Sequence, residues 1–255
     1  MAKHDATGRQ PKYLRIAAAL KDAIASGEYG PGDRLPGESD LMAAYGVARM
    51  TARQAFGVLQ AEGLAEARKG AGVFVREFRV GIRRRGIQRL AVEVWGAGGS
   101  IWAADGKGRD PQVEVLGITQ EAAPAAVAAA LGLADGAPAC VRRRRFLLDG
   151  KPVLLATSHL DAALVAGTPI TEADTGPGGI YARLAEIGHK PARFREEVRS
   201  RMPSAEEAEA LGLAAGTPVV LICRTALTAD GRAVEVNEMV LDSAAYVLEY
   251  EFDAP

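Results

Sequence analysis

Cysteine and histidine are scarce in this 255-residue chain, and it has no long apolar run. Its two cysteines, Cys140 and Cys223, are too few for a disulfide framework, and its three histidines have no partner at metal-ligand spacing. The longest apolar runs fall far short of the roughly 20 residues of a membrane span. The first residues are polar and lack the apolar stretch of a secretory signal. We therefore expect a cytoplasmic protein with buried thiols and without membrane span, metal or cofactor.

Positive charge, in contrast, is concentrated near the N-terminus. Residues 1–89 hold 16 Lys and Arg against 9 Asp and Glu, a net charge of +7, whereas residues 90–255 hold 15 against 23, a net charge of −8. Local cation density, rather than the isoelectric point of the whole chain, decides whether phosphate groups are attracted. The N-terminal third is therefore expected to bind a polyanion, and the acidic remainder to have a different partner.

Apolar periodicity in this basic third predicts three short helices. Residues 13–24 carry apolar side chains at three- and four-residue spacing, and a second helix is expected after Pro36. Three side chains of that second helix are predicted to point inward: Leu41, Met42 and Tyr45. Gly46 permits a sharp reversal, because a positive φ costs glycine little. A third helix then begins near Arg49.

The third helix separates an apolar face from a polar one. Its inward face carries Ala52, Ala55, Phe56 and Leu59. Its outward face carries Arg49, Met50, Arg53, Gln54 and Gly57. Residues 64–66 and 72–75 predict a hairpin with a basic turn from Arg68 to Ala71. The pattern favours a winged helix-turn-helix, whose third helix hydrogen-bonds to base edges, over an ordinary solvated helix face.

This stretch resembles the DNA-binding domain of the GntR family of bacterial transcription regulators. The resemblance rests on GDRLPGESDLMAAYGVARMTARQAFGVLQAEGLAEARKGAGVFV and covers roughly residues 11–76. It implies that the residues after the LP motif, the start of the third helix and the hairpin tip touch double-stranded operator DNA. The candidate DNA-contacting residues are Arg34, Ser39, Arg49, Met50, Thr51, Arg53, Gln54, Lys69 and Gly70.

The resemblance also implies a role for several of these residues. Ser39 and Thr51 are expected to contact phosphates, and Arg49 and Arg53 to reach bases or phosphates. The hairpin tip, residues 69–70, is expected to enter the minor groove.

An internal repeat organises the rest of the chain. The pattern Leu-Gly-Leu followed by Gly and Pro occurs at residues 131–138 and again at 211–218. Each copy follows an Ala-rich helical stretch and precedes two strands joined by an Asp-Gly turn, at Asp149 and Asp230. Two such units predict a mixed α/β (α+β) domain with a mostly antiparallel sheet and a cleft between the related halves. Another helix is expected over residues 180–187.

This second part resembles the ligand-binding half of the HutC-type GntR regulators, the UTRA domain, over roughly residues 90–252. The similarity rests on an arginine-rich strand before an Asp-Gly-x-Pro turn and on the segments GGIYARLAEIGH, LGLAAGTPV and VEVNEMVLD. It implies a chorismate-lyase-like fold that binds a small anionic or polar metabolite and joins two chains in a homodimer.

Alternation along the arginine-rich strand places Arg142 and Arg144 on one face, where two guanidinium groups can hold a phosphate or a carboxylate. Relatives commonly carry a further arginine where Phe146 stands here. Part of this arginine run must instead be solvated. Residues 174–179 lead into a helix N-terminus and form either an anion site or an ordinary turn. The candidate effector-binding residues are Arg142, Arg144, Ser158, Gly179, Tyr181, Glu235 and Tyr246.

The sequence thus predicts a ligand-responsive transcription regulator, a repressor released from a palindromic operator by its effector. The expected divisions are a DNA-binding domain at 1–76, a basic linker at 77–89 that couples the two domains, and an effector-binding and dimerisation domain at 90–255. Two tryptophans, Trp95 and Trp102, either line a pocket or anchor the entry into the second domain.

Two alternatives remain. One is a small-molecule enzyme or sensor with an incidental helix-turn-helix, and the other is an architectural DNA-binding protein without a ligand. We expect no catalytic residue, because Ser158 and His159 are adjacent on a strand and point to opposite faces.

Overall fold

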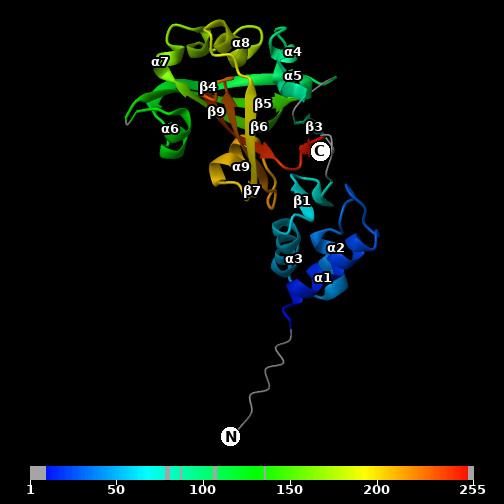
Figure 1. The fold of residues 1–255 in the computed structure, drawn as a ribbon. Coiled ribbons are helices and arrows are strands. Elements are labelled where there is room, and N and C mark those ends of the chain that lie inside the picture. Colours follow the sequence, from blue (N-terminus) through cyan, green and yellow to red (C-terminus); the bar gives the residue numbers. More distant parts are fainter. Residues whose placement is uncertain (1–9, 78–80, 87, 106–107, 135, 252–255) are drawn as a thin grey trace. The chain divides into compact units, whose positions relative to one another are not determined.

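The N-terminal unit of the computed structural model consists of three helices and a hairpin (Figure 1). The structure describes residues 10–77, 81–86, 88–105, 108–134 and 136–251. The elements of this unit are α1 (Lys12–Ala25), α2 (Glu38–Tyr45), α3 (Arg49–Ala61), β1 (Ala65–Arg68) and β2 (Gly72–Val75). This order confirms the predicted winged helix-turn-helix.

The apolar faces of α1 and α3 form the core of this unit. The buried side chains of α3 are those that the helical period predicts: Ala52, Ala55, Phe56 and Leu59. On α2, Leu41 is buried as predicted, but the prediction for Tyr45 is wrong, because this residue is 42% exposed. The helix ends at Tyr45, and Val47, just beyond the turn at Gly46, packs against the core instead.

Local hydrogen bonds and backbone geometry position α2, α3 and the hairpin. Asp40 accepts a hydrogen bond from the backbone N–H of Gly37 at 2.8 Å, which fixes the start of α2. Gly46 has a φ of +56°, the left-handed conformation that lets the chain reverse into α3. Strands β1 and β2 are antiparallel, with Arg68 opposite Gly72, so the hairpin tip comprises residues 69–71.

The second unit is an α+β domain. Its strands are β3 (Ile82–Arg85), β4 (Pro111–Ala122), β5 (Pro138–Leu148), β6 (Lys151–Asp161), β7 (Arg193–Arg201), β8 (Val219–Leu227), β9 (Ala233–Asp242) and β10 (Tyr246–Glu249). Its α-helices are α4 (Val92–Trp95), α5 (Ile101–Asp105), α6 (Ala125–Leu131), α7 (Ala162–Val165), α8 (Gly179–Glu186) and α9 (Ala205–Leu211).

Six of these strands form one antiparallel sheet in the order β4-β5-β6-β9-β8-β7. The order confirms the internal repeat, since β4-α6-β5-β6 and β7-α9-β8-β9 are equivalent halves that meet where β6 pairs with β9. The sequence predicts only the helix and the two following strands of each half. Strands β4 and β7 lie at the two edges of the sheet and are largely exposed, so they lack a clear apolar alternation.

Helices cover both faces of this sheet (Figure 1). Helices α4, α5, α7 and α8 lie over one face, and α6 and α9 lie over the other. Trp95, Ile180 and Leu184 belong to the core cluster on the first side. None of the described helices is both long and apolar enough to cross a membrane.

Part of the segment predicted as a basic linker is a strand. Residues 82–85 form β3, which pairs in parallel with β10 and is the exception to the antiparallel pattern. Ile82 and Arg84 are buried, whereas Arg83 and Arg85 are exposed. The sequence shows the positive charge of this segment, but the alternation becomes visible only when β10 supplies a pairing partner.

Candidate functional site

The outward face of α3 carries the side chains that the sequence predicts to contact DNA. Arg49, Met50, Arg53 and Gln54 are exposed, and Thr51 is half-buried. The side chains of Arg49 and Arg53 are 63% and 57% exposed, so both are accessible to a partner. A guanidinium group in this setting can donate two hydrogen bonds to one guanine.

Glu38, the first residue of α2, joins these two arginines. Its Oε1 accepts a hydrogen bond from Nε of Arg53 at 2.7 Å, and its Oε2 lies 3.2 Å from Nε of Arg49. The carboxylate therefore sets the directions of both side chains. The sequence pattern does not single out Glu38, because only the turn between α2 and α3 brings it to the arginines.

The other candidate DNA-contacting residues lie on α2 and along the hairpin. Ser39 is exposed in the first turn of α2, and Lys69 and Gly70 are exposed at the hairpin tip. Arg34 is also exposed, and its guanidinium lies beside the hairpin, since a Cβ added to Gly72 would be 3.1 Å from its Nε. The predicted contacts thus come from α2, α3 and the hairpin of one unit.

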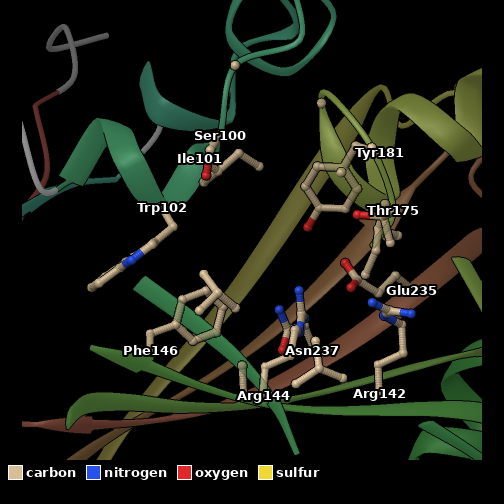
Figure 2. A pocket seen from close by; sticks show the side chains of 18 of the residues that line it. Ser100, Ile101, Trp102, Arg142, Arg144, Phe146, Thr175, Tyr181, Glu235 and Asn237 are labelled. Carbon is tan, nitrogen blue, oxygen red and sulfur yellow. The ribbon is translucent and has the colours of Figure 1, made fainter. Parts of the chain in front are cut away.

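The second unit contains a pocket of about 610 Å³ on the face of the sheet that α4, α5 and α8 cover (Figure 2). Arg142 and Arg144 reach it from β5, Glu235 and Asn237 from β9, and Tyr181 from α8. Because β5 and β9 belong to different halves of the repeat, the pocket occupies the cleft that the duplication predicts.

Arg142 is almost fully buried and binds backbone carbonyl groups. Its guanidinium donates hydrogen bonds to the carbonyl oxygens of Ile170, Glu172 and Ala173. Burial lowers the pKa of Arg142, and the neighbouring Arg144 lowers it further. This side chain therefore holds the segment that leads to α8 as well as lining the pocket.

Arg144 lies next to Arg142 on the same face of β5. Its Nη2 donates to Oγ of Ser158 at 2.5 Å, and its guanidinium carbon lies 5.6 Å from the centre of the Phe146 ring. Burial lowers the pKa of Arg144, an effect that the facing carboxylate of Glu235 opposes. A half-buried, oriented guanidinium of this kind suits an anionic ligand.

Two predicted effector contacts lie outside the pocket lining. Ser158 is fully buried, and its Oγ accepts a hydrogen bond from Arg144, so it positions that side chain without lining the pocket itself. Tyr246 belongs to a core cluster with Ile82 and Trp102, at the start of β10. A buried core tyrosine and a ligand-binding tyrosine look the same in a sequence.

A chain of polar contacts that the sequence did not reveal leads from the pocket to β3. Nη1 of Arg224 donates to the hydroxyl of Tyr181 at 3.4 Å, and Nε of Arg224 binds Glu196 at 2.7 Å. The same carboxylate binds Nη2 of Arg84 at 2.5 Å. Burial raises the pKa of Tyr181, which keeps its hydroxyl protonated and able to donate. These residues come from four separate elements, β3, α8, β7 and β8.

The turn before α8 closes one side of the pocket. Residues 174–179 line it, and Gly179 is the first residue of the helix. A side chain at Gly178 would collide with the carbonyl oxygen of Trp95, and the N–H of Gly178 donates to the carbonyl of Gly98 at 3.1 Å. The glycines thus allow this turn to pack against the segment that joins α4 to α5.

The sequence left open whether each tryptophan lines a pocket or anchors the second domain, and the structure shows one of each. Trp95 is a core residue whose Nε1 donates to the carbonyl of Leu90 at 3.1 Å. Trp102 lines the pocket and contacts Phe146 edge to face, with ring centres 5.2 Å apart.

Positive charge predominates in the pocket. Four arginines line it, Arg89, Arg142, Arg144 and Arg224, against two carboxylates, Asp174 and Glu235. The formal sum is therefore +2, and the surroundings are partly apolar, which strengthens electrostatic attraction. This pocket is suited to an anionic or polar small molecule.

Known families match both parts of the chain. The profile of bacterial regulatory proteins of the gntR family matches residues 12–75, and the UTRA domain matches residues 106–246. The chain belongs to the GntR family. It is a ligand-responsive, DNA-binding transcription regulator whose UTRA domain contains the pocket.

Similar proteins span nearly the whole of this GntR regulator. The HTH-type transcriptional regulator SCO4628 of Streptomyces coelicolor is 33% identical and aligns with 97% of this chain and 94% of its own length. The HTH-type transcriptional repressor NagR of Bacillus subtilis is 28% identical over 95% of both chains. A solved crystal structure of a GntR-family transcriptional regulator has a TM-score of 0.64 and 30% identity, and the match covers 96% of this chain and 99% of that one.

Proposed function

We propose that this GntR regulator is a repressor that binds a palindromic operator as a homodimer and dissociates when a small anionic or polar metabolite fills the pocket. The observation that carries the proposal is the cationic pocket of the second unit, in a chain whose first unit exposes arginines on a helix-turn-helix. The similarity to NagR, which is named a repressor, supports the direction of regulation.

In this proposal residues 1–76 form the DNA-binding domain, and residues 90–255 form the effector-binding and dimerisation domain. One helix-turn-helix makes few base contacts, so a two-fold symmetric pair of heads on a two-fold symmetric operator supplies the affinity. The protein acts in the cytoplasm, where its operator lies.

The proposed coupling between effector and DNA runs through β3. This strand follows the DNA-binding unit in the chain, and Arg84 on it shares the carboxylate of Glu196 with the pocket residue Arg224. An effector that draws Arg224 towards itself weakens that shared pair. The shift in equilibrium is no larger than the difference between its affinities for the two conformers.

Two measurements on the purified full chain test the proposed function. Selection from a random duplex library is expected to yield a palindromic site, and a gel-shift titration is expected to show its release by one metabolite. A metabolite screen by thermal shift supplies the candidates, because a ligand selective for the folded state raises the unfolding temperature. Binding to all duplexes alike, with or without metabolites, would contradict the proposal. Turnover of a pocket ligand would instead favour the enzyme alternative.

The coupling segment has its own test. Insertion of glycine and serine residues ahead of Ile82 is expected to weaken release of DNA by the effector and to leave effector binding intact. Unchanged release in the lengthened protein would remove β3 from the mechanism.

A further inference from the structure

The sheet face that underlies the pocket changes from polar to apolar along the strands. One row of register neighbours crosses β5, β6, β9, β8 and β7 and is polar throughout: Arg142, Ser158, Asn237, Arg224 and Glu196. A second row on the same face crosses β4, β5, β6 and β9 and is apolar throughout: Val113, Phe146, Leu154 and Leu241. Four residues along β5 separate the rows, which corresponds to about 13 Å.

The apolar end of the pocket is built from large side chains. Trp102 and Phe146 are only 6% and 8% exposed, and their rings contact each other edge to face. Ile101, Leu154 and Met239 complete this end. Figure 2 shows Trp102 and Phe146 at one side of the pocket and Arg142 and Glu235 at the other. A flat or branched apolar group fits this end better than a sugar ring does, because the several hydroxyl groups of a sugar would find few hydrogen-bond partners among these side chains.

At the polar end of the pocket, a ligand must both donate and accept hydrogen bonds. Oε2 of Glu235 and Oδ1 of Asn237 are buried acceptors without a hydrogen-bond partner in the described part of the chain. Nη2 of Arg224 is a buried donor that likewise lacks a hydrogen-bond partner in the described residues. Buried polar groups are normally paired, so this end is complementary to a head group that donates and accepts at adjacent atoms.

The charge of the pocket favours an anionic head group. The four arginines and two carboxylates of the lining sum to +2, and the pair of Glu196 with Arg84 behind the lining leaves this sum unchanged. The two buried acceptors of Glu235 and Asn237 favour a single carboxylate with an adjacent donor over a phosphate dianion, which has no donor to offer them.

We propose that the pocket binds an amphipathic carboxylic acid with a hydroxyl or amino group next to the carboxylate and an apolar, ring-bearing tail. The carboxylate lies against Arg144 and Arg224, the adjacent donor faces Glu235 and Asn237, and the tail packs on Phe146 and Trp102. This inference rests on the proposed function only in taking the pocket as the effector site.

Calorimetric titration of the full chain, without DNA, tests the ligand class. The probes are 3-phenyllactate and phenylalanine, which share the head and the tail and differ in the donor. Lactate retains only the head, 2-phenylethanol retains only the tail, and glucose 6-phosphate represents a polar dianion. At least one of the two complete acids is expected to bind at least about tenfold more tightly than either half molecule and than glucose 6-phosphate.

Lactate or glucose 6-phosphate binding as tightly as the complete acids overturns the inference. So does the absence of heat from both complete acids at concentrations up to about 10 mM. Because no DNA is present, either result leaves the operator proposal standing, and a failure to find an operator leaves this titration unaffected.

Three single-residue variants test where the apolar tail of the ligand binds. Phe146→Gln is expected to lower the affinity for the acid that binds by about tenfold and to leave any weak lactate binding unchanged. Phe146→Leu, the matched control, retains an apolar surface and is expected to lose less. Ile101→Asn on α5 tests the same end from outside the sheet, so the result does not depend on β5 tolerating a polar side chain. Equal affinity in Phe146→Gln, Ile101→Asn and the parent chain overturns the placement.

Discussion

Arginine has opposite environments in the two units of this regulator. Arg49 and Arg53 are exposed on α3 and share one carboxylate, whereas Arg142 and Arg224 are buried and bound to fixed carbonyl, carboxylate or hydroxyl oxygens. An exposed cation can reach a long polyanion, but salt screens it. A buried guanidinium moves less far, but it is already oriented for a partner. The same residue type therefore serves an extended partner in one unit and a small ligand in the other.

The largest effect is expected from Arg142→Ala, which tests how much a buried arginine stabilises the second unit. The change removes a buried side chain and leaves three carbonyl oxygens, of which that of Ile170 is buried, without their donor, at a cost of about 3–5 kcal/mol in the free energy of unfolding. Denaturant unfolding measures it. Arg143→Ala is the matched control on the opposite face of β5, where the side chain is exposed, and should leave stability nearly unchanged. Similar losses in the two variants would contradict the structural role of Arg142.

Glu196→Gln is expected to have the next largest effect and to depend on pH. Burial acts to raise the pKa of Glu196, but Arg224 and Arg84 lower it below its ordinary value of 4.5. The folded state therefore favours the ionised form, which stabilises the protein above about pH 4.5 and ceases to do so as pH falls through the lower, folded value.

At neutral pH the loss of this charge is expected to cost about 2 kcal/mol in unfolding free energy. The difference between the parent chain and Glu196→Gln should shrink as the pH falls below 4.5. Denaturant unfolding across this range provides the measurement. A difference that is constant with pH would show that the charge of Glu196 does not stabilise the fold.

On the exposed side, Arg53→Ala is expected to cost about 1–3 kcal/mol in binding to the selected operator if the side chain reads a base. The unfolding temperature should change little, because the side chain is 57% exposed. Competition binding against random duplex measures the loss of specificity. Equal weakening on all sequences would reassign Arg53 to a phosphate contact.

The smallest effect is expected from Lys69→Ala at the hairpin tip. Loss of one phosphate contact should weaken binding to every duplex alike and reduce the slope of log affinity against log salt concentration by about one. Titrations at several salt concentrations provide the measurement. A slope equal to that of the parent chain would place Lys69 away from the DNA backbone.

Much of the DNA-binding unit could be predicted from the sequence because its information is local. The period of a helix assigns Ala52 and Phe56 of α3 to the core and Arg53 to the surface, and Gly46 marks the turn before it. The exposure of Tyr45 could not be predicted in this way, because it depends on which neighbouring residue closes the core.

In the effector-binding unit the repeated halves, the Asp-Gly turn at Asp149, where φ is +51°, and the shared face of Arg142 and Arg144 were predictable from the sequence. The turn and the shared face depend on residues that are neighbours in the chain, and the halves show as two similar stretches of sequence. The pairing of β3 with β10 and the position of Glu196 between Arg84 and Arg224 became visible only in the folded chain. Such pairings join residues that are distant in the chain, and no periodicity within a single strand specifies which distant strand will be its neighbour.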